Sequence, residues 1–183
     1  MAVTQTARKY SLGAKIIEDC WYSPAVVIRC IIVIAGVVSV AAAGNHFTAA
    51  GMPWYFTQRL PSFAPPGWLI GLVWMTIYAL SVISLCLYFR LTSSAARQTA
   101  LPVIALAVVN GILNALWCYL FFYLHQPGAA VVEMLLLEAT VLALIVVLWP
   151  ASRLCAALFM PYAVWVGFAT IIAWSFWQLN RSS

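Results

Sequence analysis

Charged residues are scarce in this sequence. Lys, Arg, Asp and Glu make up 7% of the 183 residues, whereas hydrophobic residues make up 66%. In an average soluble domain, roughly a quarter of the residues are charged. A globule of this length has too little interior to bury so much apolar surface. The composition therefore excludes an ordinary soluble domain and indicates a protein that crosses a membrane several times.

Sequence motifs for nucleotide, metal or covalent chemistry are also lacking. There is no GxxxxGK[ST] or GxGxxG loop and no Ser/His/Asp arrangement in a sensible context. The cysteines form no CxxC pair, and the two histidines, His46 and His125, have no cluster of carboxylates or thiols beside them. We therefore expect no metal site, no resident cofactor and no ATPase or hydrolase. The modest positive charge lies at span edges, where anionic lipid explains it without nucleic acid.

Five apolar stretches are long enough to span a membrane, which requires about 20 helical residues each. Each must be helical, because a lone strand would leave backbone groups unpaired in hydrocarbon. The short connections predict an all-α integral membrane protein, a five-transmembrane-helix bundle over residues 24–180. Residues 1–23 are an N-terminal extension that is flexible or lies on the membrane surface. The expected spans are approximately 24–43, 66–89, 101–124, 128–149 and 155–178.

The basic residues fall mainly on one side of these expected spans. Only Arg59 and Arg181 lie on the other side. Because cytoplasmic segments of membrane proteins are enriched in Lys and Arg, this distribution predicts a cytoplasmic N-terminus. The residues on the favoured side are Arg8, Lys9, Lys15, Arg29, Arg90, Arg97 and Arg153.

Polar side chains in the third span share one helical stripe. Asn110, Asn114 and Trp117 are spaced at i, i+4 and i+7. An unpaired amide in lipid costs several kcal/mol, so the stripe should face the bundle interior. It either holds neighbouring helices together by hydrogen bonds or lines a ligand cavity. Beside it, Gly111 and Ala115 permit close approach of another helix, either within the bundle or from a second copy in a homodimer.

Two acidic residues lie in the fourth span. Glu133 and Glu138 are five residues apart, which places them about 140° apart around a helix. They therefore do not form one carboxylate pair. Glu133 lies near the start of its span, within reach of the interface. Glu138 lies deeper, where an ionisable residue is either a satisfied interior acid or a ligand or proton contact.

Aromatic and proline residues gather around the connection between the first two spans. Pro65 and Pro66 should end this loop and begin the second helix. The nearby Trp and Tyr residues suit either an aromatic belt at the headgroups or a flat ligand surface. In the fifth span, Trp165 and Ala169 at i and i+4 leave a slot for a planar ligand, or pack large against small. The aromatic residues near the loop are Trp54, Tyr55, Trp68 and Trp74.

In this order, the residues resemble the translocator protein family, also called tryptophan-rich sensory proteins or peripheral-type benzodiazepine receptors. The resemblance extends over most of residues 25–180. It is carried by Trp54-Tyr55, Leu60-Pro61, Pro65-Pro66, Trp68, Val73-Trp74, Tyr78, Asn110, Leu113-Asn114, Trp117, Phe121-Phe122, Pro161-Tyr162, Trp165, Phe168-Ala169 and Leu179-Asn180.

The resemblance implies a five-helix bundle, often dimeric, with a ligand pocket under the loop between the first two spans. Family members bind porphyrins such as protoporphyrin IX, several bind cholesterol, and drug-like ligands enter the same pocket. Trp117 and Glu138 are also ligand-binding candidates. Their positions within the third and fourth spans suggest this role, and the matched motifs do not. The residues that the matched motifs place at this pocket are Tyr55, Pro65, Trp74, Asn110, Asn114, Trp165 and Ala169.

Some positions depart from the family pattern. Asn110 stands where many members have Gln. After Tyr162 the only basic residue is Arg181, too distant for the cholesterol pattern, which argues against sterol binding. The sequence thus predicts a membrane binding protein for tetrapyrroles and related planar hydrophobic ligands, acting as sensor, carrier or scavenger. The alternatives are a light- and oxygen-dependent porphyrin-degrading enzyme, and a transporter of sterols or tetrapyrroles.

Overall fold

The computed structural model describes residues 24–91 and 94–181, and within these ranges it is helical with no strand. The N-terminal extension, 1–23, lies outside the described residues. The helices in chain order are α2 (Pro24–Tyr55), α3 (Gly67–Phe89), α4 (Ser94–Cys118), the π-helical segment η1 (Tyr119–Tyr123), α5 (Pro127–Leu148), α6 (Arg153–Ala157) and α7 (Met160–Asn180).

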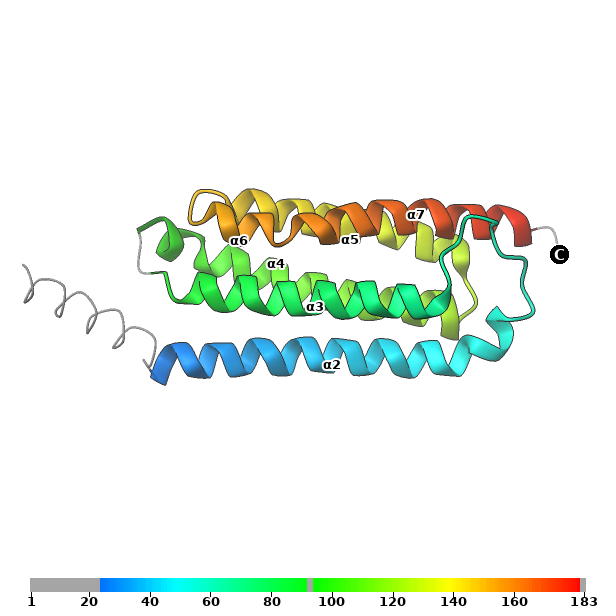
Figure 1. Cartoon of the computed structure of the whole chain (residues 1–183), viewed down its shortest axis with the longest axis horizontal. Helices are drawn as coiled ribbons and strands as arrows, with labels where there is room; N and C mark the ends of the chain where they lie inside the picture. Colours follow the sequence, from blue (N-terminus) through cyan, green and yellow to red (C-terminus); the bar gives the residue numbers. More distant parts are fainter. Residues whose placement is uncertain (1–23, 92–93, 182–183) are drawn as a thin grey trace, which may run out of the picture.

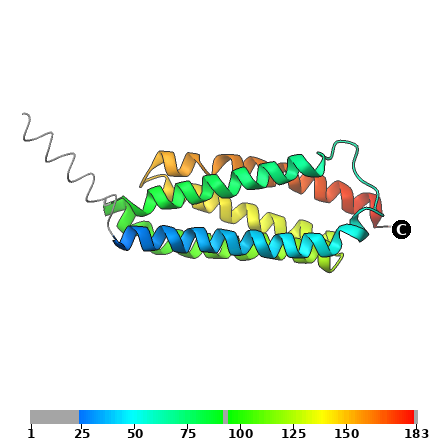
Figure 2. The same cartoon turned by 60° about the horizontal axis from the view of Figure 1, so that its bottom comes forward.

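These helices form an up-and-down bundle. Five rods are long and apolar enough to cross a membrane, with α4 continuing into η1 and α6 into α7. Figure 1 shows the start of α2 at the same end as α6, while the end of α7 and the loop after α2 lie at the opposite end, the loop end. In the turned view, α2 and α3 still run along the length of the bundle (Figure 2). The expected five-helix membrane fold is confirmed.

The first helix is longer than expected. The sequence predicted a break over residues 44–65, but α2 continues to Tyr55 and the loop covers only 56–66. Two glycines in this part of α2 are contact points with neighbouring elements. A Cβ on Gly44 would lie 3.3 Å from the Cys118 sulfur, and one on Gly51 would overlap the carbonyl of Phe122. Close packing of α2 on α4 and η1 thus overrides the weak helix propensity of glycine.

Two other helix limits differ from the expected spans. α4 begins at Ser94, well before the expected start at 101, and continues through Pro102. The fifth span is interrupted between α6 and α7, close to Pro161. Proline lacks a backbone N–H and is best accommodated in the first turn of a helix, so Pro161 begins α7 rather than lying inside one continuous helix.

The core is centred on α5, which packs between α4 and α7. Leu137, Val141 and Leu144 of α5 are fully buried among apolar neighbours from the surrounding helices. In contrast, α2 buries few side chains and exposes aliphatic residues such as Ile31 and Ile32. Extensive outward apolar surface is what a lipid-embedded helix requires, because hydrocarbon is its solvent.

The topology gathers basic residues at the end where α2 begins. Arg29 lies in the second turn of α2, Arg97 and Arg153 lie in the first turns of α4 and α6, and Arg90 lies just after α3. Arg181 follows α7 at the loop end. This grouping is the basis of the predicted cytoplasmic N-terminus, and the orientation itself stays a prediction.

Candidate functional site

The two amides of the third span form the centre of a hydrogen-bonded chain. Asn110 is 8% exposed and Asn114 is 4% exposed. The Tyr78 hydroxyl donates to Asn114 Oδ1 over 2.8 Å, and Asn114 Nδ2 donates to the Tyr162 hydroxyl over 3.0 Å. Tyr162 in turn donates to Asn110 Oδ1 over 3.2 Å. Finally, Asn110 Nδ2 donates to Thr140 Oγ1 over 2.9 Å.

This chain, the amide network, links α3, α4, α5 and α7. In this conformation each amide has its oxygen and its nitrogen paired, so the network holds four helices together. Interhelical hydrogen bonds of this kind are a general means of helix association in membranes. The network also concentrates polar groups at one depth of the bundle.

Tryptophans of two helices lie beside the amide network. The Trp74 ring meets the Tyr162 ring edge-on, with centroids 5.8 Å apart, and lies 5.6 Å from the Tyr78 ring. Trp165, one turn after Tyr162, packs with Ala169 against the same core. The indole nitrogen of Trp165 is buried and has no hydrogen-bond partner among the described residues. Thus the Trp74 ring contacts the two tyrosines that pair with the amides of α4, and Trp165 follows Tyr162 on α7.

A second aromatic group closes the loop end of the bundle. Phe121 and Phe176 are buried there, and Tyr55 stacks on Phe176 with centroids 5.8 Å apart. Trp117 stacks on Phe121 at 5.0 Å, and its indole nitrogen is also buried without a partner in the described part of the chain. Because Trp117 packs against both this group and the main core, aromatic surface continues from the loop to the amide network.

The loop over residues 56–66 is fastened to α7 by one side chain. Asn180 Oδ1 accepts from the Arg59 backbone N–H over 3.0 Å, and Asn180 Nδ2 donates to the Arg59 carbonyl over 2.9 Å. Pro61 is buried and Pro65 is half-buried, whereas Phe63 is exposed. The loop thus lies at the end of the bundle and is joined to α7 by these two hydrogen bonds.

The two acids of α5 occupy different environments. Glu133 was expected within reach of the interface, and this was wrong: it is 4% exposed, and neither carboxyl oxygen has a hydrogen-bond partner among the described residues. Glu138 is partly exposed, with one unpartnered oxygen. Since Thr140 faces Asn110, Glu138 lies about 200° around the helix from that contact. The structure does not bring Glu138 to the amide network.

Sequence reasoning missed Glu133 as a candidate because its position near the helix start suggested solvent access. It named Tyr78 and Tyr162 only in the resemblance and did not consider Thr140. A phenol or hydroxyl within a span is a weak signal alone, since it can bond its own helix. Its partner on another helix becomes known only when the helices are placed.

The small residues of α4 face a neighbouring helix. A Cβ on Gly111 would lie 3.1 Å from a Val40 methyl of α2, and Ala115 is half-buried one turn later. Gly111 thus contributes to packing within the bundle. A homodimer stays a prediction. Among residues 24–91 and 94–181, no group of three or more His, Cys, Asp or Glu side chains could hold a metal ion.

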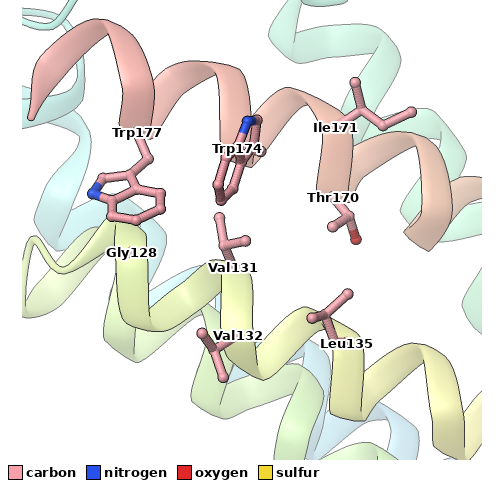
Figure 3. A pocket seen from close by; sticks show the side chains of 8 residues that line it. All are labelled: Gly128, Val131, Val132, Leu135, Thr170, Ile171, Trp174 and Trp177. Carbon is pink, nitrogen blue, oxygen red and sulfur yellow. The ribbon is translucent and has the colours of Figure 1, made fainter.

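An outer groove of 460 Å³ runs between α5 and α7. Figure 3 shows Trp174 and Thr170 of α7 pointing toward Val131 and Leu135 of α5. The Thr170 hydroxyl donates to the Val166 carbonyl of its own helix, so the groove presents an apolar surface. The other lining residues are Gly128, Val132, Ile171 and Trp177.

A sequence model of the TspO/MBR family matches residues 30–178, a region that includes parts of all five spanning rods. The chain belongs to the TspO/MBR family. The protein CrtK of Rhodobacter capsulatus is 35% identical over 69% of this chain and 78% of its own length. The tryptophan-rich protein TspO of Archaeoglobus fulgidus is 30% identical over 84% of this chain and 98% of its own. The human translocator protein is 31% identical over 75% of this chain and 82% of its own.

This membership confirms the resemblance drawn from the motifs. It also confirms that this TspO/MBR protein is a multi-pass membrane protein. The matched region includes the amide network, Trp74, Trp165 and the loop over residues 56–66.

Proposed function

We propose that this protein binds tetrapyrroles such as protoporphyrin IX, and related planar hydrophobic molecules, inside the bundle beneath the loop. It acts as a sensor, carrier or scavenger of these ligands. The observation that supports this proposal best is the convergence of Trp74, Trp165 and the amide network from separate helices. Flat aromatic surface beside a few fixed polar groups is typical of sites for apolar ligands.

The unpartnered indole nitrogens favour a ligand over a purely structural role. A buried donor without an acceptor costs about 1–3 kcal/mol. Trp117 and Trp165 each carry such a donor. A guest that stacks on these rings and offers acceptors at its edges would satisfy both. Porphyrins have this combination of a flat apolar face and polar substituents.

Access to the interior requires the loop to move. The side-chain amide of Asn180 fastens the loop at Arg59. The chain from α2 through the loop into α3 places Tyr55 and Pro65 on either side of this attachment. Breaking two hydrogen bonds would release the cover while leaving the helices in place. Such movable covers commonly set the rate at which ligands enter and leave.

Titration of the purified protein with protoporphyrin IX, read by quenching of intrinsic Trp fluorescence, tests the proposal. We expect saturable quenching whose Kd rises about tenfold or more in Trp74→Ala and Trp165→Ala, because each loses stacking area. Trp174→Ala, in the outer groove, is the matched control and should keep the wild-type Kd. Unchanged Kd values in both interior variants, or a loss of affinity confined to Trp174→Ala, would indicate that the ligand binds outside the proposed interior site.

A further inference from the structure

The carboxyl group of Glu133 is the least satisfied polar group in the described part of the bundle. Both of its oxygens are buried and lack hydrogen-bond partners among residues 24–91 and 94–181. The cost of such burial is high, and replacing an unpaired buried acid by an apolar residue is often neutral or stabilising. Stability of the bundle therefore gives no reason for an acid at this position. A ligand group that forms hydrogen bonds with this carboxyl group would give a reason for the acid.

The helix register places Glu133 level with Trp117. The bond from Asn110 to Thr140 aligns α4 with the antiparallel α5. Two turns further along α4 is Trp117, and two turns back along α5 is Glu133. Consistently, the carboxyl group of Glu133 lies within electrostatic range of Cys118, the residue after Trp117. A buried acid and a buried indole N–H, both unpartnered, thus lie at one level on adjacent helices.

The combination of these groups selects one ligand chemistry. As a neutral acid, the form that an apolar interior tolerates, a carboxyl group offers an O–H donor and the indole offers an N–H donor. Two donors at one level on adjacent helices match the two oxygens of a carboxylate, and hydrogen bonds to a charged acceptor are the stronger kind. A cationic or N–H-bearing guest fits less well, because it would leave the Trp117 donor without an acceptor.

We propose that Glu133 and Trp117 form a subsite that binds the carboxyl group of the ligand. This inference rests on the proposed function and narrows it, because it makes a peripheral carboxylate a requirement for tight binding. The carboxyl-bearing edge of the guest would point toward the loop end of the bundle, where Trp117 stacks on Phe121. Its flat face would lie toward Trp74 and Trp165.

The test compares protoporphyrin IX with its dimethyl ester, which has the same ring but no free carboxyl group. We expect the wild-type protein to bind the free acid about tenfold more tightly than the ester, the size of one hydrogen bond to a charged group. Glu133→Leu and Trp117→Phe should each bring this ratio close to one, because the free acid loses more affinity than the ester when a donor is removed. Glu133→Gln, whose amide still donates, should keep most of the preference.

Glu138→Leu is the matched control, since it removes an acid from the same helix on a different face. It should retain the wild-type ratio. Thermal unfolding separates binding from structure: Glu133→Leu should keep or raise the Tm, because no partner is lost. A wild-type ratio near one, or an unchanged ratio in Trp117→Phe and Glu133→Leu, would overturn the subsite and leave the proposed function standing. Failure of the wild-type protein to bind either compound would overturn both.

Discussion

The interior of the bundle and the outer groove between α5 and α7 both present aromatic rings, but they differ in their polar groups. In the interior, Tyr78, Asn114 and Tyr162 are bonded to one another across three helices. In the groove, the Thr170 hydroxyl is bonded within its own helix. Of these two regions, only the interior therefore has polar side chains whose hydrogen bonds depend on how several helices are placed.

This difference determines what each region can recognise. An apolar groove open to the bilayer suits an acyl chain, because dispersion contacts tolerate many orientations. A site with fixed donors and acceptors discriminates between ligands, because an ill-matched guest leaves buried polar groups unpaired. We expect mutations in the interior to affect stability and selectivity, and equivalent mutations in the groove to affect neither strongly.

The largest expected effect concerns glycine at a helix contact. Gly51→Ala would place a methyl group against the Phe122 backbone carbonyl, which cannot move without shifting η1. We expect a loss of about 3 kcal/mol in the free energy of unfolding, the upper end for overpacking. Gly128→Ala in the groove adds a methyl group at 3.0 Å from the Trp177 side chain, which can rotate toward lipid. Chemical unfolding in mixed micelles measures the stability of both variants. Equal losses in Gly51→Ala and Gly128→Ala would contradict the expected difference between the helix contact and the groove.

A smaller effect is expected at the amide network. Asn114→Leu leaves the hydroxyls of Tyr78 and Tyr162 without their amide partner. The free energy of unfolding should fall by about 2 kcal/mol, typical of a buried group left unsatisfied. Thr170→Val is the groove counterpart, and it should change stability by less than about 0.5 kcal/mol because it removes only a bond within α7. An Asn114→Leu protein as stable as wild type would show that the network contributes little.

The smallest effect should come from the attachment of the loop. Asn180→Asp keeps an acceptor for the Arg59 N–H but loses the donor to the Arg59 carbonyl. One hydrogen bond of about 1 kcal/mol corresponds to a change of about fivefold, so stopped-flow association of protoporphyrin IX should become a few-fold faster. Gln178→Glu adds the same charge two residues away and should leave the rate unchanged. Equal rates in Asn180→Asp and wild type would argue that the loop does not limit entry.

Much of the fold could be predicted from the sequence because lipid imposes strict rules. Hydrophobic length gave the five spanning rods, and Pro66 correctly marked the start of α3. The failures have a common physical cause. The breaks predicted over 44–65 and before residue 101 were too long, because local sequence character was weighed without the helices that pack against these residues.

The candidate site was less predictable than the fold. The stripe of Asn110 and Asn114 correctly indicated an inward face, since an amide in hydrocarbon must find a partner. The identity of the partners could not be predicted, because Tyr78, Thr140 and Tyr162 come from three other helices. Glu133 shows the reverse problem, for its sequence position suggested the interface and its packing placed it in the core.

The sequence by itself determined that this chain is a membrane bundle of the TspO/MBR family, because hydropathy and ordered motifs are properties of the chain alone. Tertiary structure alone decided which polar groups are paired and which are left without a partner. The physical reason is that hydrogen bonding in a bundle depends on helix register and rotation. One turn of displacement between α4 and α5 would separate Asn110 from Thr140 and would move Trp117 and Glu133 to different levels.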